Sequence, residues 1–268
     1  MGFEEPVKIM DENQAEWAPL YTLSPLNRFS SRAEDYAKYR PSYPTQAINT
    51  ILAGLPPLSE LVAADIGAGT GISSHLIAER EVSVIAVEPN AEMRQAIQEH
   101  GKIRVCYGTA EDTSLPDASV DLVTCFQAFH WFNPELALIE FHRILKHKGR
   151  LALVWNNRDQ TDELINEYTN LVRAIAENHP AESRMESVKP LFKSQLFTNI
   201  HESNFIYQQE LDLNGFIGRA MSVSYLPREG EKHEQLVTGL KNIYHRYSNE
   251  KGLIYMSYRT SVYLGEAA

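Results

Sequence analysis

The chain has 268 residues, a formal net charge of −10 and a pI of about 5.4. This charge disfavours non-specific binding to nucleic acids and anionic membranes, although it is compatible with a local basic pocket. Hydrophobic residues make up 43% of the chain, enough for a full core, and no apolar run is long enough to span a membrane. No signal peptide is visible at the acidic N-terminus, so we expect a cytoplasmic protein.

Residues 1–25 show no clear hydrophobic period and are expected to form a flexible arm or a segment that binds a partner. The next segment, 29–43, is rich in tyrosine and contains Arg40 followed by Pro41. The residue before a proline favours extended backbone, so Arg40 should leave any helix and reach inward, where its guanidinium could pair with a carboxylate. The alternative is a surface arginine beside tyrosines that pack as an ordinary helix face.

A helix is expected over 45–55, followed by a buried strand that begins at Val62 and leads into a glycine turn. The turn places Gly67, Gly69 and Gly71 at every second position, which fits neither a dinucleotide fingerprint nor a phosphate-binding P-loop. Glycines there allow a ligand to approach the backbone. Asp65, two residues earlier, would repel a pyrophosphate and attract an ammonium or sulfonium. S-adenosylmethionine carries both groups and has no phosphate.

The apolar run over 82–88 predicts a central parallel strand, after a helix over 72–80. The strand ends in Glu88, about 20 residues after the glycine turn, where α/β folds hold ribose hydroxyls. A helix over 90–100 and a strand over 103–107 follow. Alternating strands and helices imply parallel βαβ units, whose ligands lie at the carboxyl ends of the strands. Asp65, Glu88 and Glu111 all fall at or just past such ends.

A fourth strand, 120–126, runs directly into an aromatic segment that contains His130. This histidine is the one group there that titrates near neutrality, so it is the first candidate for a general base. A hydrogen-bonded histidine that only orients the loop is the alternative. A helix from Asn133 to Gly149 and a fifth strand over 151–155 come next. Cys106 and Cys125 lie inside predicted strands, and we expect both to be buried, reduced thiols.

Beyond residue 162 we expect helices over 162–177 and 231–248 and strands over 205–211 and 253–264. The chain thus divides into an N-terminal arm and lid (1–45), an α/β core (46–160) and a C-terminal part that completes the sheet and carries cap helices (161–268).

Four motifs in order resemble those of the class I S-adenosylmethionine-dependent methyltransferases, over roughly residues 60–155. They are the glycine turn 65–71, the segment 87–90, the segment 108–116 and the aromatic segment 126–132. The segment 40–44 is similar to that of the small-molecule branch related to trans-aconitate methyltransferase, where it folds over the cofactor as a lid. The resemblance implies a Rossmann-like, doubly wound, seven-stranded, mostly parallel sheet with an N-terminal helical lid and a small helical cap insertion.

The resemblance also implies site residues. S-adenosylmethionine would be bound, and S-adenosylhomocysteine released, by Tyr36, Arg40, Asp65, Gly67, Ala68, Gly69, Thr70, Gly71, Glu88, Pro89, Met93, Ala110, Glu111 and Gln127. The acceptor would contact Trp131, Arg158, Arg219 and Tyr225. For several of these, including Glu111, Arg158 and the segment 216–225, an ordinary structural role is the alternative.

The expected activity is methyl transfer to a small molecule, with O-methylation of a small carboxylic acid as the first possibility. A quinone precursor, phenol, amine or lipid-like acceptor remains open, as does a non-catalytic S-adenosylmethionine-binding module. Aminopropyl transfer is disfavoured because no paired-aspartate signature follows the fourth strand. We expect a monomer or homodimer, with no nucleic-acid partner, no stable membrane insertion and no metal site.

Overall fold

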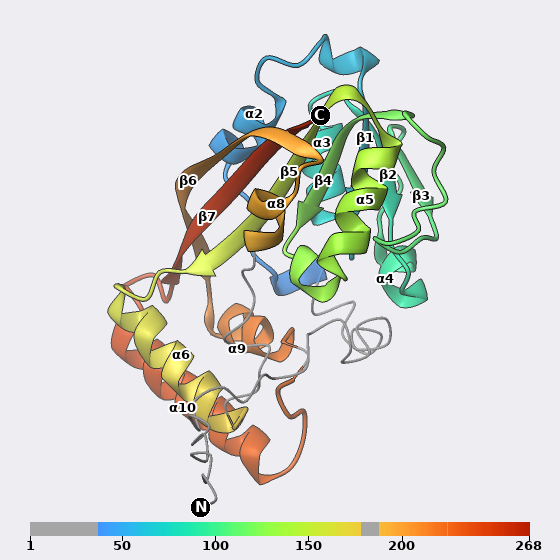
Figure 1. Cartoon of the computed structure of the whole chain (residues 1–268). Helices are drawn as coiled ribbons and strands as arrows, with labels where there is room; N and C mark the ends of the chain where they lie inside the picture. Colours follow the sequence, from blue (N-terminus) through green and yellow to red (C-terminus); the bar gives the residue numbers. More distant parts are fainter. Residues whose placement is uncertain (1–36, 178–187, 224) are drawn as a thin grey trace, which may run out of the picture.

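In the computed structural model, residues 37–177, 188–223 and 225–268 are described. Seven strands form one sheet in the order β3-β2-β1-β4-β5-β7-β6 (Figure 1). The strands are β1 (Val62–Ile66), β2 (Ser83–Val87), β3 (Ile103–Cys106), β4 (Val120–Phe126), β5 (Leu145–Arg158), β6 (Phe197–Leu211) and β7 (Ile254–Ala267). The pairs among β1 to β5 are parallel, and β7 runs antiparallel to both β5 and β6. The predicted mostly parallel, seven-stranded fold is confirmed.

The helices cover both faces of the sheet and extend beyond one end of it. They are α2 (Thr45–Leu52), α3 (Ile72–Ala78), α4 (Ala91–Ala96), α5 (Pro134–Ile144), α6 (Glu163–Ile175), α8 (Lys189–Lys193), α9 (Leu213–Met221) and α10 (Glu231–Tyr247). One core cluster unites α5 and α8 with one face of the sheet, and another unites α2 and α3 with the opposite face. No described helix is long and apolar enough to cross a membrane.

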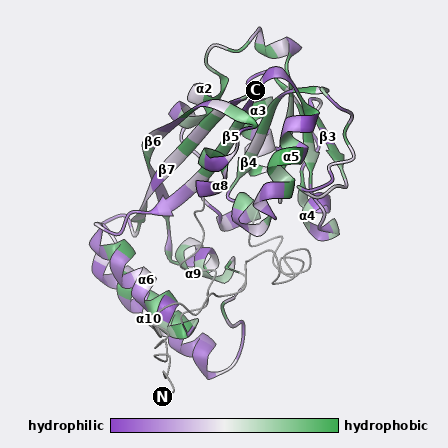
Figure 2. Ribbon diagram, viewed as in Figure 1, coloured by the Kyte–Doolittle hydropathy of each residue, from purple (hydrophilic) through white to green (hydrophobic). Residues whose placement is uncertain are grey.

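A third core cluster lies outside this sandwich. Helices α6, α9 and α10 gather at the end of β6 and β7, away from α2 and α3 (Figure 1), and bury Tyr168, Phe216 and Leu240 among them. Both α6 and α10 carry hydrophilic as well as hydrophobic residues (Figure 2), as expected for helices with one buried face. These three helices are the candidates for the cap helices predicted in the C-terminal part.

Helix starts follow the local sequence closely. The side chains of Asn90, Asn133, Asp162 and Asp212 each precede a helix and accept hydrogen bonds from its first turn. Such N-caps satisfy backbone N–H groups that have no partner within the helix. Predicted and observed starts therefore agree within a residue or two for α4, α5 and α6.

Helix ends were harder to predict. The helix expected to end at Gly149 ends at Ile144, because the chain turns extended at Leu145 and already pairs with Val120 there. The register then shifts, so that Arg150 pairs with Leu122. Helix α4 ends at Ala96 instead of residue 100, because Ile97 turns extended and its side chain packs beside Gly71.

Both cysteines lie in strands and are free thiols. Cys125 in β4 is buried as expected, whereas Cys106, at the end of the edge strand β3, is only half-buried. Burial raises the pKa of both thiols, which keeps them in the unreactive protonated form.

Candidate functional site

One cleft opens at the carboxyl ends of β1, β4 and β5, where the strand order reverses between β1 and β4. It encloses about 940 Å³, including solvent at its mouth. The lining comes from the N-terminal segment, the glycine turn and the start of α3, the end of β4 and the segment after it, the end of β5, and α9 with the residues after it. The lining residues are Arg40, Pro41, Tyr43, Gly67, Ala68, Gly69, Thr70, Ile72, Ser73, Phe126, Gln127, His130, Trp131, Asn156, Arg158, Arg219, Val223 and Tyr225.

The glycine turn forms the floor of one half of the cleft. Gly67, Gly69 and Gly71 all have positive φ angles, which residues with a side chain rarely adopt. A Cβ on Gly67 would lie 2.8 Å from the Cβ of Ala128 and 2.9 Å from Phe132. The turn therefore needs glycine for its conformation and, at Gly67, for the close approach of the loop after β4.

Asp65 lies behind this turn and does not line the cleft, contrary to the sequence-based expectation that its charge faces the ligand. Its carboxylate accepts hydrogen bonds from the hydroxyls of Ser73 and Ser74, both at 2.6 Å, and of Thr124 at 2.9 Å. Burial raises its pKa, and the three hydroxyls oppose that effect. Asp65 thus ties β1 to the start of α3 and to β4, and it positions the loop between them.

Glu88 supports the same turn from β2. One carboxylate oxygen accepts the N–H of Gly69 at 2.9 Å, and the other accepts the N–H of Asn90 at 2.9 Å. Burial raises the pKa of Glu88, opposed by these two backbone hydrogen bonds. The side chain is buried and does not line the cleft, so its contact with a ribose stays a prediction.

Other expected cofactor residues also lie off the cleft wall. Met93 and Ala110 are buried, and Glu111 accepts the N–H of Asn133 at 2.8 Å. Gly71 is the N-cap of α3, and Pro89 accepts a hydrogen bond from Arg94 through its carbonyl. Tyr36 lies outside the described residues.

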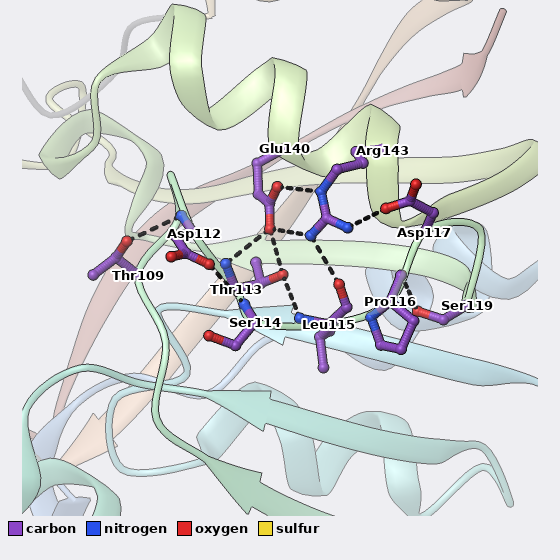
Figure 3. A network of polar contacts seen from close by, with 10 residues as sticks. All are labelled: Thr109, Asp112, Thr113, Ser114, Leu115, Pro116, Asp117, Ser119, Glu140 and Arg143. Atoms are coloured by element: carbon purple, nitrogen blue, oxygen red, sulfur yellow. Dashed lines mark hydrogen bonds and ion pairs between the residues drawn. The ribbon is translucent and has the colours of Figure 1, made fainter.

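A polar network anchors the loop between β3 and β4, which carries Ala110 and Glu111 (Figure 3). One oxygen of Glu140 accepts both the N–H and the hydroxyl of Thr113, at 2.8 and 2.6 Å. Arg143 donates to both oxygens of Glu140, to Asp117 and to the carbonyl of Leu115. Although partial burial acts to raise it, the hydrogen bonds of Arg143 and Thr113 lower the pKa of Glu140. The loop is thereby fixed to α5.

His130 lies on the cleft wall and is 8% exposed. The indole N–H of Trp155 donates to its Nδ1 at 3.3 Å. Burial, and secondly the charge of Arg40, lower the pKa of His130 to about 3. Its imidazole is therefore neutral near pH 7, and its Nδ1 lone pair is already engaged by Trp155. The general-base role that the sequence suggested stays a prediction, and this geometry does not favour it.

Three arginines, Arg40, Arg158 and Arg219, line the cleft, and no acidic residue lines it within the described part of the chain. Arg219 is only 4% exposed. Its Nε donates to the Tyr258 hydroxyl at 3.2 Å, while its buried Nη1 has no hydrogen-bond partner among residues 37–177, 188–223 and 225–268. A buried charge without a counter-ion is costly, so this guanidinium is suited to an anion that enters the cleft.

The N-terminal segment 39–43 crosses the cleft and is held from three sides. Gln209 of β6 donates to the Tyr39 carbonyl at 2.9 Å, Arg40 donates to the Ser222 carbonyl at 3.2 Å, and Asn156 of β5 donates to the Ser42 carbonyl at 2.9 Å. The sequence analysis predicts a lid at this segment, and the described part of the segment contributes residues to the cleft lining.

Two residues outside the predicted set of site residues, Asn156 and Tyr258, connect the elements around the cleft. Asn156 accepts from Thr260 and donates its backbone N–H to Gln127, whose φ of +51° is unusual for a residue with a side chain. Tyr258 links Arg219 to Gln209. Only the position of Asn156 at the end of a buried strand could have signalled a role, since its partners lie up to 114 residues away.

The turn fits S-adenosylmethionine in one further respect. The buried hydroxyl of Thr70, on the cleft wall, has no hydrogen-bond partner within the described residues. An unpaired buried hydroxyl beside the glycine turn is a polar group that a bound ligand could satisfy. The residues that would hold the cofactor are Gly67 to Thr70, Gln127 and Arg40.

Several known proteins are similar to this chain in sequence. A methyltransferase domain family matches residues 64–153. An uncharacterized methyltransferase of Mycobacterium tuberculosis is 33% identical over 198 residues, 74% of this chain and 76% of the relative. An uncharacterized methyltransferase of Schizosaccharomyces pombe is 32% identical over 222 residues, 80% of this chain and 88% of the relative.

Two solved structures share the fold. A protein from Anaeromyxobacter dehalogenans, provisionally assigned as a type II methyltransferase, superposes with a TM-score of 0.64 at 20% identity, over 85% of this chain and 98% of that one. The YcgJ protein from Bacillus subtilis gives a TM-score of 0.54 at 23% identity, over 83% and 98% of the two chains.

Proposed function

The chain belongs to the class I S-adenosylmethionine-dependent methyltransferases, and on that premise we propose that it methylates a small anionic molecule, with a carboxylic acid as the first class. The products would be a methyl ester and S-adenosylhomocysteine. The observation that carries the acceptor class is the buried guanidinium of Arg219 in a cleft without acidic residues in its described lining.

Electrostatics favour an anion over the alternative acceptors. The chain is strongly acidic overall, yet the described lining of the cleft carries three guanidinium groups and no carboxylate. A cationic amine would be repelled there, and a neutral lipid-like molecule would leave the charge of Arg219 uncompensated. A carboxylate matches a guanidinium in charge and in its planar, two-pronged geometry. Arg219 and Arg158 are the residues proposed to bind it.

The catalytic contribution of the chain is chiefly positioning. When bound, S-adenosylmethionine supplies a methyl group already activated by the sulfonium charge. The glycine turn and the 39–43 segment hold one reactant, and Arg219 and Arg158 orient the other, so that the two meet in one geometry. Tyr43 packs edge-on against Phe126 with ring centroids 4.7 Å apart, and we propose that these rings and Trp131 limit the access of water to the bound reactants.

Calorimetric titration of the purified chain with S-adenosylmethionine and S-adenosylhomocysteine tests the cofactor half. Saturable binding is expected for both, and a well-folded chain that binds neither contradicts the proposal. Acceptors are then screened by release of S-adenosylhomocysteine, beginning with small carboxylic acids and including phenols and amines. Turnover confined to amines would overturn the anionic acceptor while leaving the cofactor assignment intact.

A further inference from the structure

We propose that His130 acts as a fixed hydrogen-bond donor to the methyl acceptor and that the acceptor therefore enters the cleft already ionised. This inference rests on the proposed function. The inference extends the proposed function by distinguishing acceptors that need a general base from acceptors that do not.

The tautomer of His130 follows from its neighbour. An indole nitrogen is a donor and never an acceptor, so the 3.3 Å contact from Trp155 Nε1 requires a lone pair on His130 Nδ1. A neutral imidazole has one lone pair and one N–H, which places the proton on Nε2. Trp155 is fully buried between Phe129 and Tyr263, with ring centroids 6.4 and 5.8 Å away, so the indole cannot readily turn aside.

The surroundings keep the ring in this neutral form. His130 is almost completely buried, and Arg40 is the charged group that acts on it, from the N-terminal segment across the cleft. Trp131 packs against its ring at 5.2 Å between centroids. No carboxylate in the described lining of the cleft could stabilise an imidazolium. A second proton on this ring is therefore unfavourable, whichever nitrogen receives it.

The described part of the cleft provides no other base. Its remaining polar side chains are arginine, tyrosine, glutamine, asparagine, serine and threonine. Of these, tyrosine titrates only near pH ~10 and the others accept no proton near neutrality. A hydroxyl, thiol or carbon acceptor that must lose a proton would find no recipient in this part of the cleft.

A carboxylate acceptor needs no base. One carboxylate oxygen forms a bond to the methyl carbon while the bond between that carbon and sulfur breaks. The electron pair of the broken bond passes to sulfur. The negative charge of the acceptor and the positive charge of the sulfonium are both lost, and no proton moves. A hydrogen bond from Nε2–H of His130 to the other carboxylate oxygen would orient the acceptor. It would lower the nucleophilicity of the attacking oxygen less than a hydrogen bond to that oxygen itself would.

Nuclear magnetic resonance of the full-length, ¹⁵N-labelled chain tests the tautomer without any acceptor. The ring signals of His130 are assigned by their loss in His130→Gln, with the exposed His201→Gln as a control. We expect Nε2 to be protonated and Nδ1 to be unprotonated between about pH 5 and 8. A proton on Nδ1, or a titration midpoint within that range, would overturn the inference. In Trp155→Phe we expect the tautomers to mix, and an unchanged tautomer would show that Trp155 does not set it.

Kinetics test the consequence. For an acceptor found in the screen, kcat/KM should show no acidic limb between about pH 6 and 8. His130→Gln, which keeps a donor, should stay within about 10-fold of the original, whereas loss of a general base costs about 100-fold or more. An acidic limb that disappears in His130→Gln would identify a base. Binding of S-adenosylhomocysteine by both proteins separates this failure from failure of the proposed function.

Discussion

At the scale of single residues, burial acts on the state of two polar side chains that line the cleft. Arg219 is charged and buried with one tyrosine hydroxyl as its hydrogen-bond partner within the described chain, and His130 is kept neutral by burial. Strain and unsatisfied polarity of this kind concentrate at functional sites, because the ligand supplies what the fold omits. Both residues lead to measurable predictions.

Replacing Arg219 by methionine should separate stability from acceptor binding. The apolar side chain has a similar length and removes an uncompensated buried charge, so the free energy of unfolding should stay within about 1 kcal/mol or rise. The KM for an anionic acceptor should increase at least about 30-fold, since a charged hydrogen bond contributes roughly 2 kcal/mol or more. Urea unfolding and steady-state kinetics measure both effects. A large loss of stability with unchanged KM would show that Arg219 is structural.

The pH dependence of stability should report His130. Its pKa is near ~6.5 in the unfolded chain and about 3 in the fold. Between these values the unfolded chain binds a proton that the folded chain does not, so this contribution is complete above pH ~6.5 and is lost as the pH falls. At pH ~4.5 the loss should be about 2–3 kcal/mol.

The comparison that isolates this effect is His130→Gln, which cannot take up the proton. Urea unfolding of both proteins near pH 7 and pH 4.5 gives the difference directly, because other titrating groups contribute equally to each. The stability gap between the two proteins should narrow by about 2–3 kcal/mol at the lower pH. Parallel curves at both pH values would contradict a neutral, buried His130.

At the scale of elements, the connection between β1 and α3 depends on a buried carboxylate that does not line the cleft. Asp65 accepts from two serines in the first turn of α3 and from Thr124 in β4, so one side chain sets the relative position of three elements. Because the glycine turn joins β1 to α3, its position also depends on Asp65. We therefore propose that Asp65 affects cofactor binding through the turn.

Substituting alanine for Asp65 should leave three buried hydroxyls without their acceptor. We expect a loss of about 2–3 kcal/mol in stability and at least about 10-fold weaker binding of S-adenosylhomocysteine. Asp65→Asn retains one acceptor oxygen and should fall between the two proteins. Urea unfolding and calorimetry give the values, and normal affinity in a folded Asp65→Ala protein would exclude this positioning role.

At the scale of the whole molecule, the cleft is completed by parts of the chain that are far apart in sequence. The 39–43 segment is tied to β6, to β5 and to the end of α9, and Tyr258 connects Arg219 to the same β6 residue that holds Tyr39. Helix α9 and the N-terminal segment therefore meet at the cleft. An anion bound to Arg219 would lie beside this connection.

Gly218→Ala tests that meeting point. In an ordinary helix this change stabilises by up to about 1 kcal/mol, but here the new Cβ would lie 2.3 Å from the ring of Tyr39. The ring must move, so stability should change little while S-adenosylhomocysteine binds at least about 5-fold more weakly. Gly101→Ala, where a Cβ meets no atom within 4 Å, is the control. Equal affinity in both variants would show that Tyr39 does not help to close the site.

Much of the fold and part of the site could be predicted from the sequence alone. Runs of apolar residues separated by amphipathic helices indicate parallel βαβ units, and the glycines at 67, 69 and 71 mark a ligand-accessible turn, because both signals depend on neighbours within a few residues. Helix starts were predictable for the same reason, since an N-cap acts on its own first turn. Of the predicted cofactor and acceptor residues, Arg40, Gly67, Ala68, Gly69, Thr70, Gln127, Trp131, Arg158, Arg219 and Tyr225 line one cleft.

What only the tertiary structure decided is the direction and state of the polar side chains. Asp65 turns inward to Thr124, 59 residues away, and the N–H of Trp155, 25 residues away, donates to Nδ1 of His130. The burial of Arg219 without a carboxylate partner in the described fold is likewise a result of the packing around it. These properties arise from burial and from partners distant in sequence. Local sequence patterns identify reactive residue types, whereas the packed chain sets their protonation and their partners.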